Sequence, residues 1–143
     1  LGMEAVAFDK YIEEPPFSEV EMVNLDQLLG RSDYISLHIP FVKEEGATIA
    51  EEELKKMKDT AYLINCARGG VVDEGALTEA LKKGWIAGAG LDVFTEEPPT
   101  NEELLSLDNV SLTPHIGAST KEAQTRVGTQ AADELIDFFG KEE

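Results

Sequence analysis

Strand-like and helix-like segments alternate along most of this chain, and this alternation narrows the possible folds more than any other feature. Short apolar runs at 4–8, 21–25, 34–38, 61–65, 86–93 and 110–112 read as strands. Segments with helix formers or helical spacing lie between and after them, at 26–29, 51–57, 73–84, 101–107 and 119–139. Such alternation is typical of a mostly parallel sheet with helices on both faces, so we predict an α/β fold.

Local signals indicate where several of these elements begin and end. A turn at Pro15-Pro16 separates the first two strands, and Asp26 is predicted to cap the helix that follows the second. Gly84 suits the end of the helix that starts near Asp73, and Ser119 followed by Glu122 has the capping-box spacing. The run at 86–93 is rich in Gly and Ala, which predicts a strand with other backbone packed closely against it.

Size and charge limit the partners that we expect. The 143 residues, 42% of them hydrophobic, suffice for one globular unit with its own core. Twelve Lys plus Arg against 29 Asp plus Glu give a formal charge of −17, which would repel nucleic acid and anionic lipid. A single Arg in a cleft can still hold a small anion, so we predict a small-molecule partner, with no nucleic acid and no membrane.

Cysteine content and the first residues bear on the location of the protein. Cys66 is the single cysteine, which excludes an intrachain disulfide and a thiolate metal site and suits a reducing compartment. The sequence has no apolar run near the ~20 residues of a membrane span and no signal-peptide pattern at its start. We therefore predict a cytoplasmic protein without a metal. Because the sequence opens with Leu1 directly before a strand-like segment, we also expect it to be a piece of a longer protein.

Polar residues follow most of the predicted strands. Ligands of an open parallel sheet bind beyond the carboxyl ends of its strands, so these residues are the first candidates for a site. We expect five positions or segments to converge on one edge of the sheet, namely Asp9, Pro40, Asn65 to Arg68, Asp92 and His115.

Three segments carry a resemblance to a known family. They read NCARGGVVD at 65–73, GLDVFTEEP at 90–98 and TPHIGAST at 113–120. Together, and in this order, they resemble the signatures of the D-isomer specific 2-hydroxyacid dehydrogenases, over Leu1 to about Gly140. The run HIGASTKEAQ from His115 is most similar to the D-3-phosphoglycerate dehydrogenase branch, which acts in serine biosynthesis. The resemblance implies a Rossmann-type doubly wound fold, NAD as cofactor and a homodimer or higher homo-oligomer.

The chain departs from the family pattern in two places. The glycine-rich G-x-G-x-x-G turn is absent, and in the family it lies just before the segment that matches Leu1 to Met3. We therefore expect a sheet that is incomplete at its N-terminal side and has unpaired edges, with residues 1–118 as a partial NAD-binding domain. Residues 119–143 would form a helix leading toward an absent substrate domain. The loop at 41–47 also lacks the Thr-rich sequence that is usual in the family.

The resemblance assigns catalytic roles to three residues. Arg68 would hold the substrate carboxylate with its two-pronged guanidinium, and His115 would exchange a proton with the substrate oxygen. Glu97, which precedes Pro98, would orient the imidazole, and its neighbour Glu96 is the alternative carboxylate. By residue type alone, these could be an exposed arginine, a histidine satisfied in the core and one more surface acid.

The same reasoning gives a set of cofactor-binding residues. Asp9 ends the strand expected to be second in a dinucleotide fold, where an acid accepts the ribose hydroxyls and would repel a 2′-phosphate, so NAD is favoured over NADP. Asp92 resembles the family residue at the nicotinamide end, and His38 has a structural or cofactor-edge role. Cys66 occupies a variable position, and we interpret it mainly as a small packing residue. The full predicted set is Asp9, His38, Pro40, Cys66, Ala67, Arg68, Asp92, His115 and Gly117.

These assignments predict an NAD-dependent dehydrogenase of a D-2-hydroxy acid, with 3-phosphoglycerate as the first candidate substrate. A cofactor-binding regulatory module and an inactive fragment are the alternatives. Without the phosphate-binding turn and a substrate domain, we expect the 143-residue polypeptide by itself to lack dehydrogenase activity.

Overall fold

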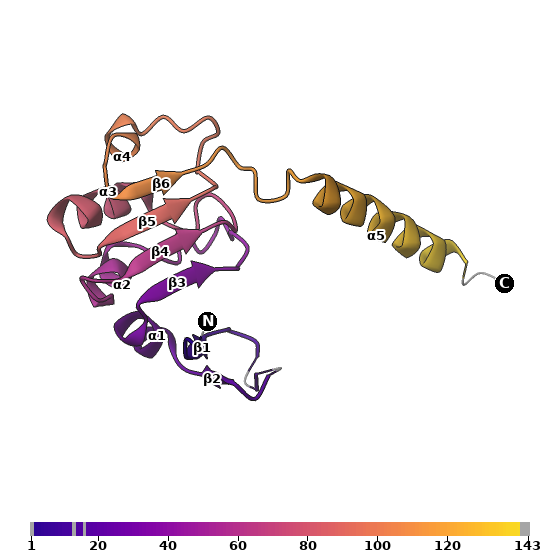
Figure 1. Cartoon of the computed structure of the whole chain (residues 1–143), viewed down its shortest axis with the longest axis horizontal. Helices are drawn as coiled ribbons and strands as arrows, with labels where there is room; N and C mark the ends of the chain where they lie inside the picture. The colour runs from indigo at the N-terminus through magenta and orange to yellow at the C-terminus, as the bar shows by residue number, and fades with distance from the viewer. Residues whose placement is uncertain (1, 13, 16, 141–143) are drawn as a thin grey trace.

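The computed structural model describes residues 2–12, 14–15 and 17–140, and its strands and helices alternate as predicted (Figure 1). The fold is α/β with parallel strands, which confirms the predicted class. In chain order the elements are β1 Ala5–Ala7, β2 Val20–Met22, α1 Leu25–Arg31, β3 Tyr34–Leu37, α2 Glu51–Lys56, β4 Tyr62–Asn65, α3 Glu74–Lys83, β5 Gly88–Leu91, α4 Glu102–Leu105, β6 Val110–Leu112 and α5 Lys121–Phe139.

The described strands form two separate sheets. Strands β3, β4, β5 and β6 lie in this order in a four-stranded parallel sheet, whereas β1 and β2 pair with each other (Figure 1). In the larger sheet Leu37 lies opposite Asn65, and Asn65 lies opposite Leu91, so the strands end level with one another. The loops that follow them therefore start from one common edge.

One face of the four-stranded sheet carries the core. Ile35, Leu37 and Leu63 are buried on this face, while the alternate residues Tyr34 and Tyr62 are exposed and stack on each other with ring centroids 5.6 Å apart. Helix α1 packs against α2, and α2 against α3. Their fully buried leucines complete the core: Leu29, Leu54 and Leu77. This packing fixes the strands whose ends carry the polar residues.

Strand β5 shows the close packing that its composition predicts. A Cβ added at Gly88 would lie 2.9 Å from the backbone oxygen of Asn109 and 2.8 Å from the ring of Tyr62. At Gly90, two residues along the same strand, the nearest atom would be 3.9 Å away. Gly88 is therefore required by a close approach, and Gly90 is not.

Two helix starts differ from the sequence prediction. Helix α1 is capped by Asn24 and not by Asp26, because the Asn24 side chain accepts from the Gln27 N–H while the Gln27 side chain accepts from the Asn24 N–H. The helix thus takes up Leu25, which we had placed in the preceding strand. Helix α5 is capped by Thr120, whose hydroxyl accepts from Ala123 N–H, and the predicted cap Ser119 lies in the turn before it.

Other predicted boundaries are confirmed. Asp73 caps α3 by accepting from Ala76 N–H, and Gly84 ends this helix in the left-handed region at φ 67°. Of the predicted Pro15-Pro16 turn, Pro16 lies outside the described residues, as do residues 141–143 of the predicted terminal helix.

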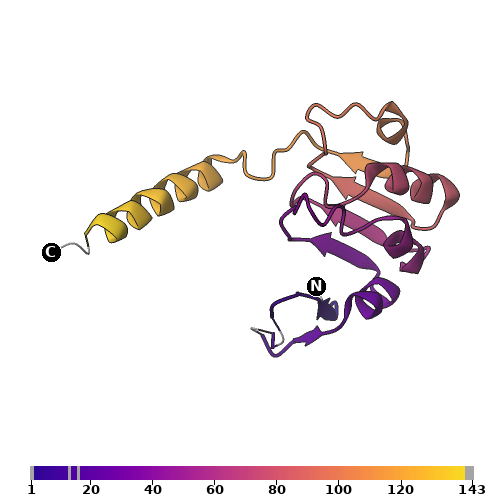
Figure 2. The ribbon, with the colours of Figure 1, turned by 180° about the vertical axis from the view of Figure 1, so that it is seen from behind.

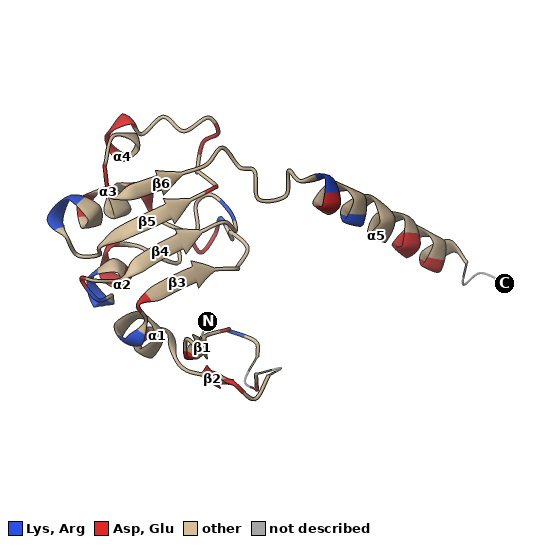
Figure 3. Ribbon diagram, viewed as in Figure 1, with Lys and Arg blue, Asp and Glu red and all other residues tan. Residues whose placement is uncertain are grey.

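Helix α5 stands away from the rest of the chain in both views (Figures 1 and 2), and none of its residues is buried. Strands β3 to β6 carry no charged residue, so the acidic excess lies outside the four-stranded sheet (Figure 3). Within the described part of the chain, no helix has the length and apolar character needed to cross a membrane.

Candidate active site

Asn65 shapes the turn that follows β4. Its side chain is 2% exposed, donates from Nδ2 to the Arg68 carbonyl at 3.0 Å and accepts at Oδ1 from Ala67 N–H at 3.1 Å. The Asn65 carbonyl also accepts from Asp92 N–H at 3.0 Å, which joins this turn to the end of β5. A buried amide therefore fixes the backbone that presents Arg68, a role that the sequence analysis did not assign to Asn65.

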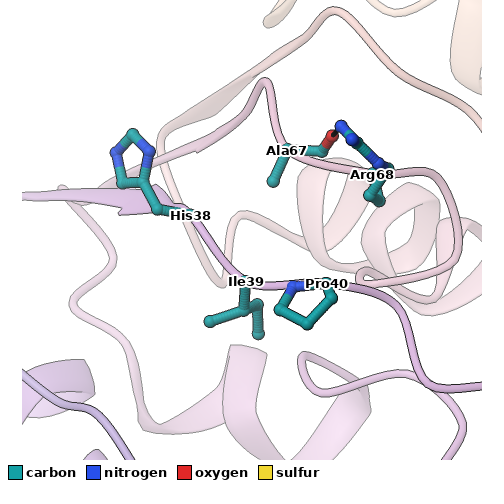
Figure 4. A pocket seen from close by; sticks show the side chains of 5 residues that line it. All are labelled: His38, Ile39, Pro40, Ala67 and Arg68. Atoms are coloured by element: carbon teal, nitrogen blue, oxygen red, sulfur yellow. Dashed lines mark hydrogen bonds between the residues drawn. The ribbon is translucent and has the colours of Figure 1, made fainter. Parts of the chain in front are cut away.

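Arg68 lies exposed beside a shallow pocket of about 290 Å³. Its Nη1 donates to the Ala67 carbonyl at 2.6 Å, and it forms no salt bridge with any residue that the structure describes. Figure 4 shows Ile39 and Pro40 on one side of the pocket, Ala67 and Arg68 on the other, and His38 at one end. The guanidinium can thus offer its remaining N–H groups to an anion.

His115 and Glu97 form the hydrogen-bonded pair that the sequence predicts. The imidazole Nδ1 lies 2.9 Å from Glu97 Oε2 and 3.1 Å from Oε1. This hydrogen bond, followed by one from Phe94 N–H, lowers the pKa of Glu97. A carboxylate at this position can only accept, so Nδ1 carries a hydrogen and Nε2 is left for another partner. The alternative Glu96 instead accepts from the Thr100 hydroxyl at 2.9 Å.

Asp92 holds the loop that carries His115. One oxygen accepts from the Thr113 hydroxyl at 2.6 Å and from Ile116 N–H at 2.9 Å, and the other accepts from Gly117 N–H at 2.8 Å. These hydrogen bonds, that of Thr113 first, lower the pKa of this buried carboxyl. They fix the backbone directly after His115. His115 itself has a left-handed φ of 54°. The loop is therefore held in place from within the domain.

The structure brings some of the predicted cofactor-binding residues together. His38, Pro40, Ala67 and Arg68 line one pocket, and Asp92 contacts Gly117 in the His115 loop. Binding of a cofactor by these residues stays a prediction. Thr113 was not among the predicted site residues, although it opens the motif TPHIGAST and its hydroxyl contacts Asp92.

Two residues at this edge of the sheet are exposed. His38 has its Nε2 2.9 Å from the Ser36 hydroxyl, and its structural or cofactor-edge role stays a prediction. Cys66 is exposed as well, so its interpretation as a packing residue is wrong. Each lies just after the end of a strand at the edge of the sheet, where side chains project past the core.

Asp9 lies in the loop after β1 of the smaller sheet, and no described contact joins it to the other candidate residues. Its Oδ1 accepts from Tyr11 N–H at 2.7 Å and from Ile12 N–H at 3.1 Å. The next residue, Lys10, forms an ion pair with Glu45, which links this loop to the loop after β3. The described residues contain no group of three or more His, Cys, Asp or Glu placed to hold a metal ion.

Comparison with known proteins gives a family match over most of the chain. The model for "D-isomer specific 2-hydroxyacid dehydrogenase, NAD binding domain" matches residues 1–117. This range contains Arg68, Glu97 and His115.

Similar proteins of known name are enzymes that act on different acids. The chain is 50% identical to glyoxylate reductase of Thermococcus litoralis over 140 residues, which are 96% of this chain and 42% of that protein. It is 48% identical to hydroxypyruvate reductase of Thermotoga maritima over 143 residues, which are 98% of this chain and 46% of that protein. It is 47% identical to D-3-phosphoglycerate dehydrogenase of Methanocaldococcus jannaschii over 138 residues, which are 94% of this chain and 26% of that protein. The chain thus spans less than half the length of these relatives.

Solved structures agree with the fold. D-lactate dehydrogenase of Aquifex aeolicus, complexed with NAD and lactic acid, superposes with a TM-score of 0.83 at 36% identity and covers 98% of this chain and 47% of that one. The NAD-complexed D-isomer specific 2-hydroxyacid dehydrogenase of Lactobacillus delbrueckii ssp. bulgaricus superposes with a TM-score of 0.82 at 36% identity. The match covers 97% of this chain and 47% of that one.

Proposed function

The chain belongs to the D-isomer specific 2-hydroxyacid dehydrogenase family, and we propose that the protein carrying it transfers hydride between NAD and C2 of a D-2-hydroxy acid. The observation that supports this best is the His115–Glu97 pair at 2.9 Å, which joins the segments after β5 and β6, the two strands that follow β4 and its Arg68 turn in the sheet. An acid–base group and a cation for a carboxylate are the two things that a protein must supply to this reaction.

Arg68 binds the carboxylate of the substrate in this proposal. Its guanidinium is exposed and forms no salt bridge among the described residues, so no internal partner has to be displaced. A planar guanidinium can donate two parallel hydrogen bonds to a carboxylate, which fixes the orientation of the attached C2.

His115 moves the proton. In oxidation the free Nε2 accepts the hydrogen of the substrate hydroxyl, and in reduction the imidazolium donates it back to the carbonyl oxygen. Glu97 stays a carboxylate, because the hydrogen bond with His115 lowers its pKa. It therefore holds Nδ1 in the donating tautomer and stabilises the imidazolium that forms when Nε2 takes up the substrate proton.

NAD would supply the hydride acceptor and donor when bound. The residues present fit such a group, because the pocket has an apolar wall of Ile39, Pro40 and Ala67 next to the polar groups of His38 and Arg68. Asp9 would receive the ribose hydroxyls, since none of the described residues donates to its Oδ2. Asp92, Cys66 and Gly117 complete the proposed cofactor-binding set.

Three acids are candidates for the substrate. The run from His115 to Gln124 favours 3-phosphoglycerate, whose phosphate would need cations outside the described pocket, where Arg68 is the one basic residue other than His38. The relatives from Thermococcus litoralis and Thermotoga maritima favour glyoxylate or hydroxypyruvate instead. A cytoplasmic location and a homo-oligomer remain parts of the proposal.

Hydroxypyruvate and 3-phosphohydroxypyruvate form a matched pair, because they differ by the phosphoryl group alone. The test is to measure kcat/KM of the whole protein for both and for glyoxylate, with NADH and with NADPH. A phosphate site should favour the phosphorylated acid by about tenfold or more, since one hydrogen bond to a charged group contributes about 1.5–3 kcal/mol. Equal or reversed values assign the protein to the unphosphorylated acids. NADH binding without turnover of any of the three acids would favour the regulatory module.

A further inference from the structure

Glu74 makes a contact that its place in the helix does not explain. It is the first residue of α3, but Asp73 already caps this helix. The Glu74 carboxylate instead accepts from Thr95 N–H at 2.6 Å, across to a loop 21 residues further along the chain. An acid in a first helical turn is favourable by itself, yet that effect requires no such partner.

The backbone of Phe94 and Thr95 is held by three contacts. The Phe94 N–H donates to Glu97 Oε1 at 3.2 Å, and the Thr95 N–H donates to Glu74. The backbone at Gly69 packs directly on the peptide group between Phe94 and Thr95, because a Cβ there would lie 1.8 Å from the Phe94 oxygen and 2.9 Å from the Thr95 nitrogen. This peptide opens the loop from which Glu97 reaches His115.

Two of these three contacts come from the segment that contains Arg68. Gly69 follows Arg68 directly, and Glu74 begins the helix that the same turn leads into. The loop that carries Glu97 is thus fixed relative to the turn that carries Arg68 through one peptide group.

We propose that Glu74 is a positioning residue for the acid–base pair: by holding Thr95 N–H it keeps the Glu97 carboxylate in register with both His115 and Arg68. The inference rests on the function proposed above. It gives a specific role to a side chain that touches neither the substrate nor the cofactor.

The proposal predicts a defined pattern for three variants. Glu74→Ala should lower kcat roughly ten- to hundredfold, the range expected when a positioned group shifts by up to about 1 Å. It should also shift the pH–rate profile toward acid, in the direction expected for loss of Glu97, with KM for NADH unchanged. Glu74→Gln keeps an acceptor oxygen and should restore most of kcat. Glu79→Ala is the matched control, because Glu79 lies on the same helix and pairs with Lys82 and Lys83.

A second readout does not depend on activity. In ¹⁵N NMR spectra of the whole protein, Glu74→Ala should move the His115 imidazole signals and the Phe94 and Thr95 amides, whereas Glu74→Gln and Glu79→Ala should leave the imidazole signals in place. Since the Thr95 contact is at the surface, all three variants should fold.

The two readouts separate the two proposals. If the wild-type whole protein turns over no 2-oxo acid, the proposed function fails, and the NMR result still decides on Glu74. Imidazole signals that are the same in Glu74→Ala and Glu79→Ala would overturn the positioning role. Unfolding of Glu74→Ala would overturn it as well. The same holds if the protein is active and its Glu74→Ala variant keeps the wild-type pH profile.

Discussion

The His115–Glu97 pair gives the most direct prediction for a single residue. The hydrogen bond with His115 lowers the pKa of Glu97 and keeps it a carboxylate, so Glu97→Gln removes a negative charge beside the imidazole and should shift the pH–rate profile toward acid in both directions of the reaction. Glu96→Gln is the matched control, because Glu96 contacts Thr100 instead of His115. The measurement is kcat/KM of the whole protein as a function of pH. An unmoved profile in Glu97→Gln would refute the orienting role.

Arg68 should act mainly in binding. Arg68→Lys keeps the charge but loses the two-pronged geometry, so KM for the 2-oxo acid should rise with little change in kcat. Arg31→Lys is the control, since Arg31 makes its two-pronged contact with Glu21 on the protein surface. Steady-state kinetics check this, and a variant that loses kcat at unchanged KM would contradict it.

Asp9 should set the preference between cofactors. An acid at the ribose repels a 2′-phosphate, so Asp9→Ser should narrow the ratio of kcat/KM between NADH and NADPH. Asp26→Ser removes a surface acid that pairs with Lys56 and should leave the ratio as it is. If both variants keep the wild-type ratio, the discrimination lies in other residues.

Among the elements, strand β5 tolerates added volume at one position and not at another. Gly88→Ala places a methyl group 2.9 Å from the Asn109 backbone, and such overpacking typically costs about 1–3 kcal/mol. Gly90→Ala meets nothing closer than 3.9 Å and should leave stability almost unchanged. The test compares urea unfolding midpoints of the two variants, and equal midpoints would mean that the strand relaxes away from Asn109.

The elements also show what a sequence can and cannot predict. All six strands overlap their predicted segments, because their apolar runs are short and bounded by polar or turn residues, although β2 ends at Met22 and not at the predicted Leu25. The caps at Asp26 and Ser119 were predicted wrongly, since Asn24 and Thr120 lie close by and have equally suitable side chains. Neighbouring polar residues compete for a cap, and the backbone geometry that decides between them does not appear in a sequence pattern.

The candidate site was predictable where motifs mark it and not where tertiary contacts make it. The Glu97–His115 hydrogen bond follows from the resemblance. The contacts of Glu74 with Thr95 and of Asp92 with Thr113 join residues 21 positions apart, which only the folded sheet brings together. The exposed positions of His38 and Cys66 likewise depend on where each strand ends.

In the molecule as a whole, the proposed catalytic set occupies a small part of the chain. Arg68, Glu97 and His115 follow β4, β5 and β6, three neighbouring strands of one parallel sheet. The set therefore lies within residues 1–117, which the family model matches. The chain spans less than half the length of the relatives named above, so activity has to be measured on the whole protein.

The measurement that tests the central claim most directly is NADH oxidation by the whole protein, wild type against His115→Ala, with hydroxypyruvate, 3-phosphohydroxypyruvate and glyoxylate. General acid–base catalysis typically contributes about 10²–10⁴-fold, so we expect kcat to fall by about that factor while the Kd for NADH stays the same. A His115→Ala variant that turns over its best acid at the wild-type rate would contradict the account.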